Sequence, residues 1–131
     1  MKRLHIHIKT TAFDESVRFY STLFSMEPAV LKSDYAKWMP NNPAINLAIS
    51  KSGSENKLEH LGIQVETAGE LTDLMETLEK AGSPDHEGET VCCYAKSTKS
   101  WITDPAGLTW EAFLTHGSSE TYRTETSTCC K

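Results

Sequence analysis

The sequence contains no apolar run near the roughly 18 residues that a membrane-spanning helix needs. Among its 131 residues, no basic run is longer than Lys2–Arg3. Thirteen Lys and Arg residues stand against eighteen Asp and Glu residues, which gives a formal net charge of −5. We therefore expect neither a membrane partner nor a nucleic-acid partner, because nucleic-acid binding needs clustered positive charge to neutralise phosphates.

The N-terminal segment also lacks the apolar core of a secretory signal peptide. It begins with two basic residues and continues as an alternation of aliphatic and polar residues. The expected localisation is therefore cytoplasmic. Cytoplasmic conditions keep cysteines reduced, so the four cysteines, Cys92-Cys93 and Cys129-Cys130, are expected to be thiols rather than a disulfide framework.

Each adjacent cysteine pair allows two interpretations. Cysteines without a chemical role commonly serve as small buried hydrophobic residues. Two neighbouring thiolates can also chelate one soft, thiophilic element. The pairs alone do not decide between these interpretations.

The hydrophobic pattern repeats in two halves with the same order of elements. In the first half, Leu4, Ile6 and Ile8 alternate with polar residues and predict a strand with a buried aliphatic face. A helix follows, with an apolar stripe made by Val17, Tyr20, Leu23 and Phe24. Three short strands are then expected at Ala29–Leu31, Tyr35–Met39 and Ile45–Ser50.

The second half repeats this order at an offset of 55 residues, with His60 falling on His5. Its strands are expected around His60 and then at Thr90–Lys96, Ser100–Thr103 and Leu108–Leu114. A turn is expected at Asp104-Pro105-Ala106-Gly107. Capping-box pairs, Thr11 with Asp14 and Thr67 with Glu70, mark the expected starts of the two helices, and Gly82 marks the end of the second.

We therefore predict an α+β fold in which two βαβββ modules, at about residues 1–50 and 58–114, form a single domain over residues 1–114. Residues 51–57 have no aliphatic side chain and are expected to form a linker. Eight of the seventeen residues in 115–131 are Ser or Thr, so this segment is expected to be a flexible tail that ends in a cysteine pair.

Strand alternation places candidate metal ligands on the faces opposite the aliphatic residues. His5, His60 and Glu111 can converge from three strands if the two halves pair their sheets. Two imidazoles and a carboxylate suit a divalent transition metal such as Fe(II), and Zn(II) would accept the same ligands. The alternative for each residue is an ordinary polar position. His7 has the same facing as His5, and we interpret it as such a polar position.

The order of these motifs resembles that of the vicinal oxygen chelate superfamily, which includes glyoxalase I, fosfomycin transferases, bleomycin-binding proteins and extradiol dioxygenases. The resemblance covers residues 1–114 and rests on His5, Phe19-Tyr20, His60-Leu61-Gly62-Ile63, Asp104-Pro105-Ala106-Gly107 and Glu111. Within it, Tyr35–Met39, Gly88–Ser97 and Trp101–Pro105 look like the Fe(II)-dependent C–As lyases, which are similar to proteins described as cadmium-induced.

This resemblance implies O2-dependent cleavage of carbon–arsenic bonds in trivalent organoarsenicals, either methylarsonous acid or reduced aromatic arsenicals, with release of arsenite. It implies a curved mixed sheet around a metal cleft, and it implies that His5, His60 and Glu111 are catalytic Fe(II) ligands. Ni, Co, Zn or Mn could occupy the same site. Whether the chain acts alone or as a homodimer stays open.

The resemblance also implies that Cys92 and Cys93 bind trivalent arsenic. In a regular strand the two side chains would point to opposite faces, so both reach one arsenic only if the chain departs from a strand there. The preceding stretch is rich in turn residues and predicts a mobile 82–95 segment that folds over the iron.

Two alternatives of other kinds remain. A glyoxalase-type or fosfomycin-type metalloenzyme would need a fourth ligand or a cationic pocket, and neither pattern is evident. A cadmium-binding or arsenic-binding sequestration protein would use the thiols alone. Such a protein has no need of His5, His60 and Glu111, so the metal site discriminates between the two classes.

Overall fold

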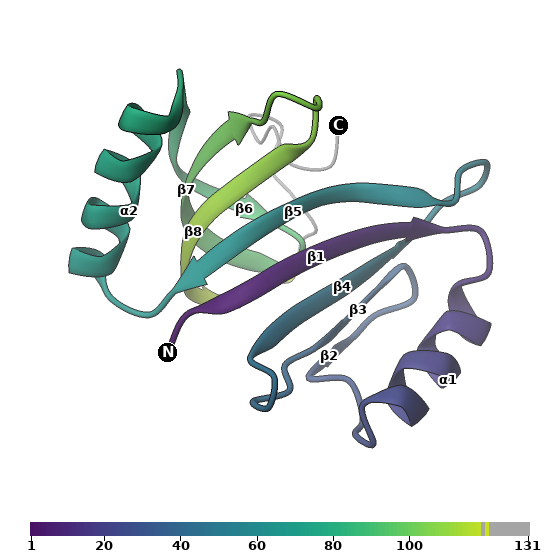
Figure 1. Cartoon of the computed structure of the whole chain (residues 1–131). Coiled ribbons are helices and arrows are strands. Elements are labelled where there is room, and N and C mark those ends of the chain that lie inside the picture. The colour runs from purple at the N-terminus through teal and green to yellow at the C-terminus, as the bar shows by residue number, and fades with distance from the viewer. Residues whose placement is uncertain (119, 121–131) are drawn as a thin grey trace. The chain divides into compact units, whose positions relative to one another are not determined.

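The computed structural model describes residues 1–118 and residue 120. A strand, a helix and three strands follow one another twice along the chain (Figure 1). The first set is β1 (Arg3–Thr10), α1 (Phe13–Leu23), β2 (Val30–Leu31), β3 (Tyr35–Trp38) and β4 (Ile45–Lys51). The second set is β5 (Lys57–Val65), α2 (Ala68–Ala81), β6 (Asp85–Cys92), β7 (Ala95–Thr103) and β8 (Thr109–Ser118). The predicted α+β class and the two βαβββ modules are confirmed.

Two compact units divide the chain. The first unit is Arg3–Leu61, and the second contains Met1–Lys2 and the chain from Gly62 onwards. The strand order is β2-β3-β4-β1-β5 in the first unit and β5-β8-β7-β6 in the second, so β5 belongs to both. In the first unit, β1 pairs with β4 in parallel and β3 pairs with β4 antiparallel, which makes the sheet mixed.

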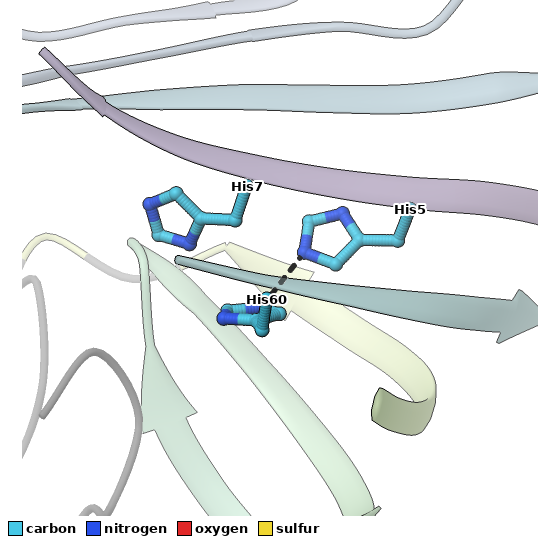
Figure 2. Close-up of side chains that lie close together, drawn as sticks. All are labelled: His5, His7 and His60. Atoms are coloured by element: carbon cyan, nitrogen blue, oxygen red, sulfur yellow. Dashed lines mark hydrogen bonds between the residues drawn. The ribbon is translucent and has the colours of Figure 1, made fainter. Parts of the chain in front are cut away.

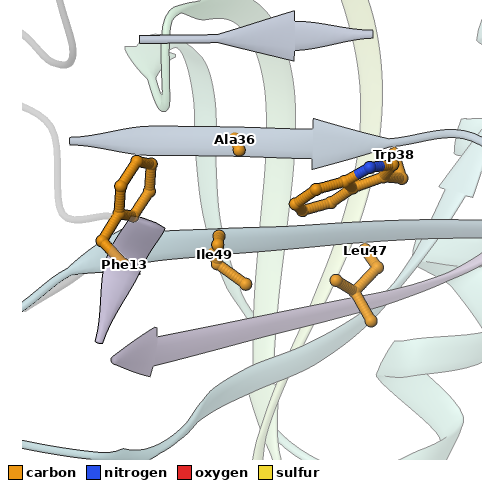
Figure 3. Close-up of a cluster of buried hydrophobic side chains, with 5 residues drawn as sticks. All are labelled: Phe13, Ala36, Trp38, Leu47 and Ile49. Atoms are coloured by element: carbon orange, nitrogen blue, oxygen red, sulfur yellow. The ribbon is translucent and has the colours of Figure 1, made fainter. Parts of the chain in front are cut away.

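The hydrophobic core of the first unit lies against one face of this sheet (Figure 3). Strand register sets Trp38 beside Leu47, and Phe13 from the start of α1 joins the same cluster. The indole Nε1 of Trp38 donates a hydrogen bond of 3.2 Å to the Ser21 hydroxyl on α1. The ring of Tyr20, also from α1, lies 5.6 Å from that of Trp38. Aromatic packing therefore fixes α1 on the sheet.

The opposite face of β1 is polar and yet more deeply buried. His5 and His7 are 5% and 0% exposed, whereas Leu4 is 44% exposed. Ile6 and Ile8 pack only partly against the core. The prediction that the aliphatic face of β1 is its buried face is therefore wrong in part, because both faces of this strand are covered.

The two helices begin differently. α2 has the predicted capping box, in which the Thr67 hydroxyl accepts from the Glu70 N–H and the Glu70 carboxylate accepts from the Thr67 N–H. α1 begins at Phe13, and its N-cap residue is Ala12, which has no side-chain cap, so the predicted box at Thr11 is wrong. The Thr11 N–H and hydroxyl bond instead to Asn56. Neither described helix is long and apolar enough to cross a membrane.

Two further expectations, one about exposure and one about where the last strand ends, differ from the structure. Leu23, which was expected in the buried stripe of α1, is 58% exposed. Residues 115–118, which were expected in the flexible tail, belong to β8, where Thr115 pairs with Ser97 and Ser118 pairs with Ala95. Backbone hydrogen bonds to β7 hold this polar segment without apolar burial. Cys129 and Cys130 lie outside the described residues.

Candidate metal centre and sulfur pair

Three imidazoles gather on the polar face of the first unit (Figure 2). His5 and His7 lie two residues apart on β1 and therefore share a face, and His60 comes from the adjacent strand β5. Each ring offers one nitrogen, and these three atoms lie within 4.8 Å of one another. All three side chains are buried, so the group could hold a metal ion out of contact with bulk water.

Hydrogen bonds assign the proton positions on two of these rings. The Nδ1 of His5 lies 3.0 Å from the main-chain oxygen of Asn46, which can only accept, so Nδ1 carries the proton. The Nε2 of His5 is then a lone pair, and it lies 3.1 Å from the Nε2 of His60. His60 therefore donates its Nε2 proton to His5.

This arrangement suits the two rings differently for metal binding. His5 already holds the tautomer that a metal needs, and a main-chain carbonyl orients the ring, as is usual for histidine ligands. His60 has its proton on the nitrogen that faces His5, so that proton must move before Nε2 can bind a cation. The Nε2 atoms of His5 and His60 already face each other.

The structure adds His7, which the sequence analysis set aside. Its Nε2 lies 2.5 Å from the Ser50 hydroxyl, and its ring centroid lies 4.9 Å from that of His60. Figure 2 shows the other nitrogen of His7 on the side of His60. The shared facing of His5 and His7 was visible in the sequence. The missing signal was the complete burial of His7, which strand alternation does not reveal.

Glu111, the predicted carboxylate ligand, lies on β8 in the second unit and is 3% exposed. Its Oε2 lies 2.7 Å from the Nζ of Lys99 on β7, and both side chains are buried. The ammonium of Lys99 also lies 5.7 Å from the ring centroid of Trp101 and 5.6 Å from that of Phe113. Lys99 was missed, because a single lysine in a strand usually indicates a solvent-exposed position.

The cysteine pair lies at the end of the β6–β7 hairpin. Cys92 pairs with Ala95, so Cys93 and Tyr94 alone form the turn. Their φ values are 55° and 61°, and two left-handed residues in succession are typical of a type I′ turn. The turn brings the two sulfur atoms, Sγ of Cys92 and Sγ of Cys93, to 3.3 Å.

The sequence analysis expected a departure from strand geometry at the cysteines, and the turn at Cys93 and Tyr94 provides it. Within the 82–95 segment that was predicted to be mobile, residues 85–92 form strand β6. The predicted strand Thr90–Lys96 is interrupted at Cys93. The turn-rich composition instead reflects Gly88, which has a φ of 81° at a shift in the β6–β7 register.

The turn is conformationally strained. Type I′ turns favour Asn and Gly, because a left-handed backbone costs other residues about 1–2 kcal/mol each. Cys93 and Tyr94 are neither Asn nor Gly, so the turn carries this cost. Backbone strain of this kind concentrates at functional sites.

The predicted turn between β7 and β8 is present. The Asp104 carboxylate accepts hydrogen bonds of 2.9 Å from the N–H groups of Ala106 and Leu108, and Gly107 has a φ of 87°. The backbone hydrogen bond from Leu108 is the main reason that the pKa of Asp104 lies below its ordinary value.

A family model and several sequences match most of this chain. The model of the Glyoxalase/Bleomycin resistance protein/Dioxygenase superfamily matches residues 2–112. A "Trivalent organoarsenical cleaving enzyme" from Bacillus sp. (strain MD1) is 38% identical over 99% of this chain and 83% of its own length. A "Probable trivalent organoarsenical cleaving enzyme" from Bacillus subtilis is 35% identical over 99% of this chain and 91% of its own length.

Other matches extend the similarity. "Cadmium-induced protein CadI" from Mycobacterium bovis is 30% identical over 99% of this chain and 93% of its own length. Among solved structures, the Mn(II)-bound glyoxalase from Novosphingobium aromaticivorans aligns with a TM-score of 0.63 at 15% identity. That alignment covers 92% of this chain and 43% of the other, and it supports the fold alone.

Proposed function

Because the chain belongs to the Glyoxalase/Bleomycin resistance protein/Dioxygenase superfamily, we propose that it is an O2-dependent enzyme that breaks the carbon–arsenic bond of trivalent organoarsenicals. The proposed metal is Fe(II). The proposed substrates are methylarsonous acid and reduced aromatic arsenicals, and arsenite is the product. The proposed role is cytoplasmic arsenic detoxification. The observation that carries this proposal is the Cys92–Cys93 sulfur pair in a chain similar along its length to organoarsenical cleaving enzymes.

The geometry of the sulfur pair supports capture of trivalent arsenic. Arsenic(III) is a soft acceptor that exchanges oxygen ligands for thiolates, and bonds from thiolate sulfur to a soft ion are about 2.3 Å long. Two sulfur atoms 3.3 Å apart can therefore both contact one arsenic atom. Capture needs both cysteines as thiolates.

The metal ligands in this proposal are His5, His60 and Glu111. His5 offers an Nε2 lone pair, and His60 offers one once its Nε2 proton has moved. The carboxylate contributes a negative charge that suits a divalent cation. When bound there, Fe(II) supplies activation of O2. His7 is a further nitrogen donor within reach of the two other histidines.

The protein side chains hold the substrate and set its surroundings. The cysteines bind the arsenic and leave its carbon substituent free to react, which provides proximity. Burial of His5, His7 and His60 keeps bulk water from the nitrogen donors. For methylarsonous acid, one O2 balances the reaction: CH3As(OH)2 and O2 give As(OH)3 and formaldehyde. Carbon is oxidised by four electrons, O2 accepts them, and arsenic stays trivalent.

The test uses reduced protein that is loaded anaerobically with Fe(II) and mixed with methylarsonous acid. O2 is then admitted, and arsenite and formaldehyde are counted per iron. Several equivalents of both products, formed only with O2, are expected. Glu111→Ala should abolish turnover but keep arsenical binding, whereas Cys93→Ser should lose arsenical binding first. The exposed Glu89→Ala serves as the matched carboxylate control, and equal losses in both assays for both site variants would contradict these roles.

The histidine cluster allows a separate measurement of metal affinity. His60→Ala removes a proposed ligand and should abolish measurable Fe(II) binding. His7→Ala should weaken binding by about tenfold, which is typical of a residue that supports the ligands. Competition with a chelating dye under anaerobic conditions measures both, and an equal loss in the two variants would make His7 a full ligand.

A second candidate function is sequestration of cadmium or arsenic without turnover. The similarity to a protein named cadmium-induced favours it. In that case the sulfur pair should bind Cd(II) or arsenic tightly, no arsenite should be released in the O2 experiment, and His60→Ala should leave thiolate binding unchanged.

A further inference from the structure

We propose that Lys99 is a positioning residue for Glu111, and that its charge weakens the binding of the divalent ion. The inference rests on the proposed role of Glu111 as a metal ligand. It assigns to a lysine in the second unit a function that the family match does not supply: control of metal affinity through the carboxylate that it holds.

The contacts of Lys99 fix its ammonium in one place. Lys99 and Glu111 lie on the same face of the β7–β8 ladder, because Lys99 pairs with Phe113 and Glu111 pairs with Trp101. The Nζ lies 2.7 Å from Glu111 Oε2, and the two side chains are 5% and 2% exposed. The aromatic rings of Trp101 and Phe113 lie within 6 Å of the same ammonium, which suits cation–π contact.

The ion pair divides the two oxygens of the carboxylate. The Lys99 ammonium donates to Oε2 of Glu111. Lys99 therefore favours coordination through a single oxygen and limits rotation of the carboxylate. A carboxylate held in this way is prepared for a ligand of defined geometry.

The same ion pair acts in opposite directions on the two states of the protein. Without metal, a buried carboxylate is costly unless it is paired, and Lys99 provides the pairing. With a divalent ion on Glu111, two positive groups share one carboxylate and repel each other. Lys99 should thus stabilise the metal-free protein and oppose metal binding. A lysine with a purely structural role would not have the second effect.

The experiment compares Lys99→Met with wild-type protein. Methionine keeps an unbranched side chain of similar length and removes the charge. Dissociation constants for Fe(II) and Co(II) are measured anaerobically by competition with a chelating dye, and thermal unfolding is followed with and without metal. The expected result is metal binding that is about tenfold tighter. The metal-free protein should unfold at a lower temperature, and the rise on adding metal should be larger.

Three further variants make the test decisive. Lys99→Arg keeps the charge and should bind metal within about threefold of wild type. Lys99→Gln has the same expectation as Lys99→Met and replaces it if that variant does not fold. Glu111→Gln removes the carboxylate and should weaken metal binding. In the double variant, the effect of Lys99→Met should vanish.

The outcomes separate the two proposals. If Glu111→Gln binds metal as well as wild type, the ligand role of Glu111 fails, and this inference fails with it. If Glu111→Gln weakens binding but Lys99→Met leaves it unchanged or weaker, only the role of Lys99 is overturned.

Discussion

In the first unit, the sheet face opposite the hydrophobic core carries side chains that can be neutral, and His5, His7 and Ser50 are buried there. In the second unit, one face of β7 and β8 carries a buried ion pair between Lys99 and Glu111. The same order of elements therefore supports two kinds of chemistry. The first unit offers nitrogen donors, and the second offers a buried carboxylate that is paired with a lysine.

The hairpins of the two modules differ in the same way. β2 and β3 have two and four residues and are joined by Lys32, Ser33 and Asp34, none of which has a positive φ. β6 and β7 have eight and nine residues and are joined at Cys93 and Tyr94, both with positive φ. Of these two hairpins, the one that carries the sulfur atoms is longer and has the left-handed residues.

The largest expected effect on stability comes from the hydrophobic core of the first unit. Trp38→Ala should lower the free energy of unfolding by about 4 kcal/mol, because it empties the centre of the first core and removes the bond to Ser21. Denaturant unfolding measures the loss. Half-buried Trp110→Ala in the second unit is the control, and an equal loss there would contradict a core centred on Trp38.

The helix starts provide a smaller test of the comparison. Thr67→Ala should cost about 1 kcal/mol, because it breaks the capping box of α2, and Thr67→Ser should restore most of that loss. Thr11→Ala should change stability by less than about 0.5 kcal/mol, because Thr11 does not cap α1. Thermal unfolding of the three variants measures these differences. A larger loss of stability for Thr11→Ala than for Thr67→Ala would contradict the absence of a cap at Thr11.

A glycine substitution in the strained turn should raise the stability of the protein instead of lowering it. Tyr94→Gly should stabilise the protein by up to about 1 kcal/mol, because glycine accepts a left-handed backbone without steric cost. Asp34→Gly in the shorter hairpin has no such strain to relieve and should destabilise slightly. If both variants change the unfolding temperature alike, the turn at Cys93 and Tyr94 is not strained.

The smallest effect depends on pH and concerns the β7–β8 turn. The pKa of Asp104 is lowered in the folded protein, so the carboxylate stabilises the fold above its unfolded pKa, and this contribution is lost as pH falls through the folded pKa. Asp104→Asn should therefore be less stable than wild type at pH 7. The difference should shrink below a pH of about 4, and a constant difference from pH 7 to pH 3 would contradict this origin.

Periodicity in the sequence was sufficient to predict the element order and the equivalence of His5 and His60. It did not predict which face of β1 is buried, because alternation separates two faces without stating what covers each.

The candidate site was partly predictable for a related reason. Strand alternation and the repeat proposed His5, His60 and Glu111, and the structure brings His5 and His60 together. Lys99 and His7 gain significance only from the partners that register and burial give them. The type I′ turn at Cys93 was not predictable from composition, because its two residues are not those that usually form such turns.

The proton on His5 is fixed by a main-chain oxygen, and this has an evolutionary consequence. The register of β1 and β4 supplies the acceptor at position 46 whatever side chain stands there. Sequence drift at that position can therefore reshape the surroundings of the imidazole while its lone pair stays available. The position of the proton on the His5 ring therefore follows from the pairing of β1 with β4.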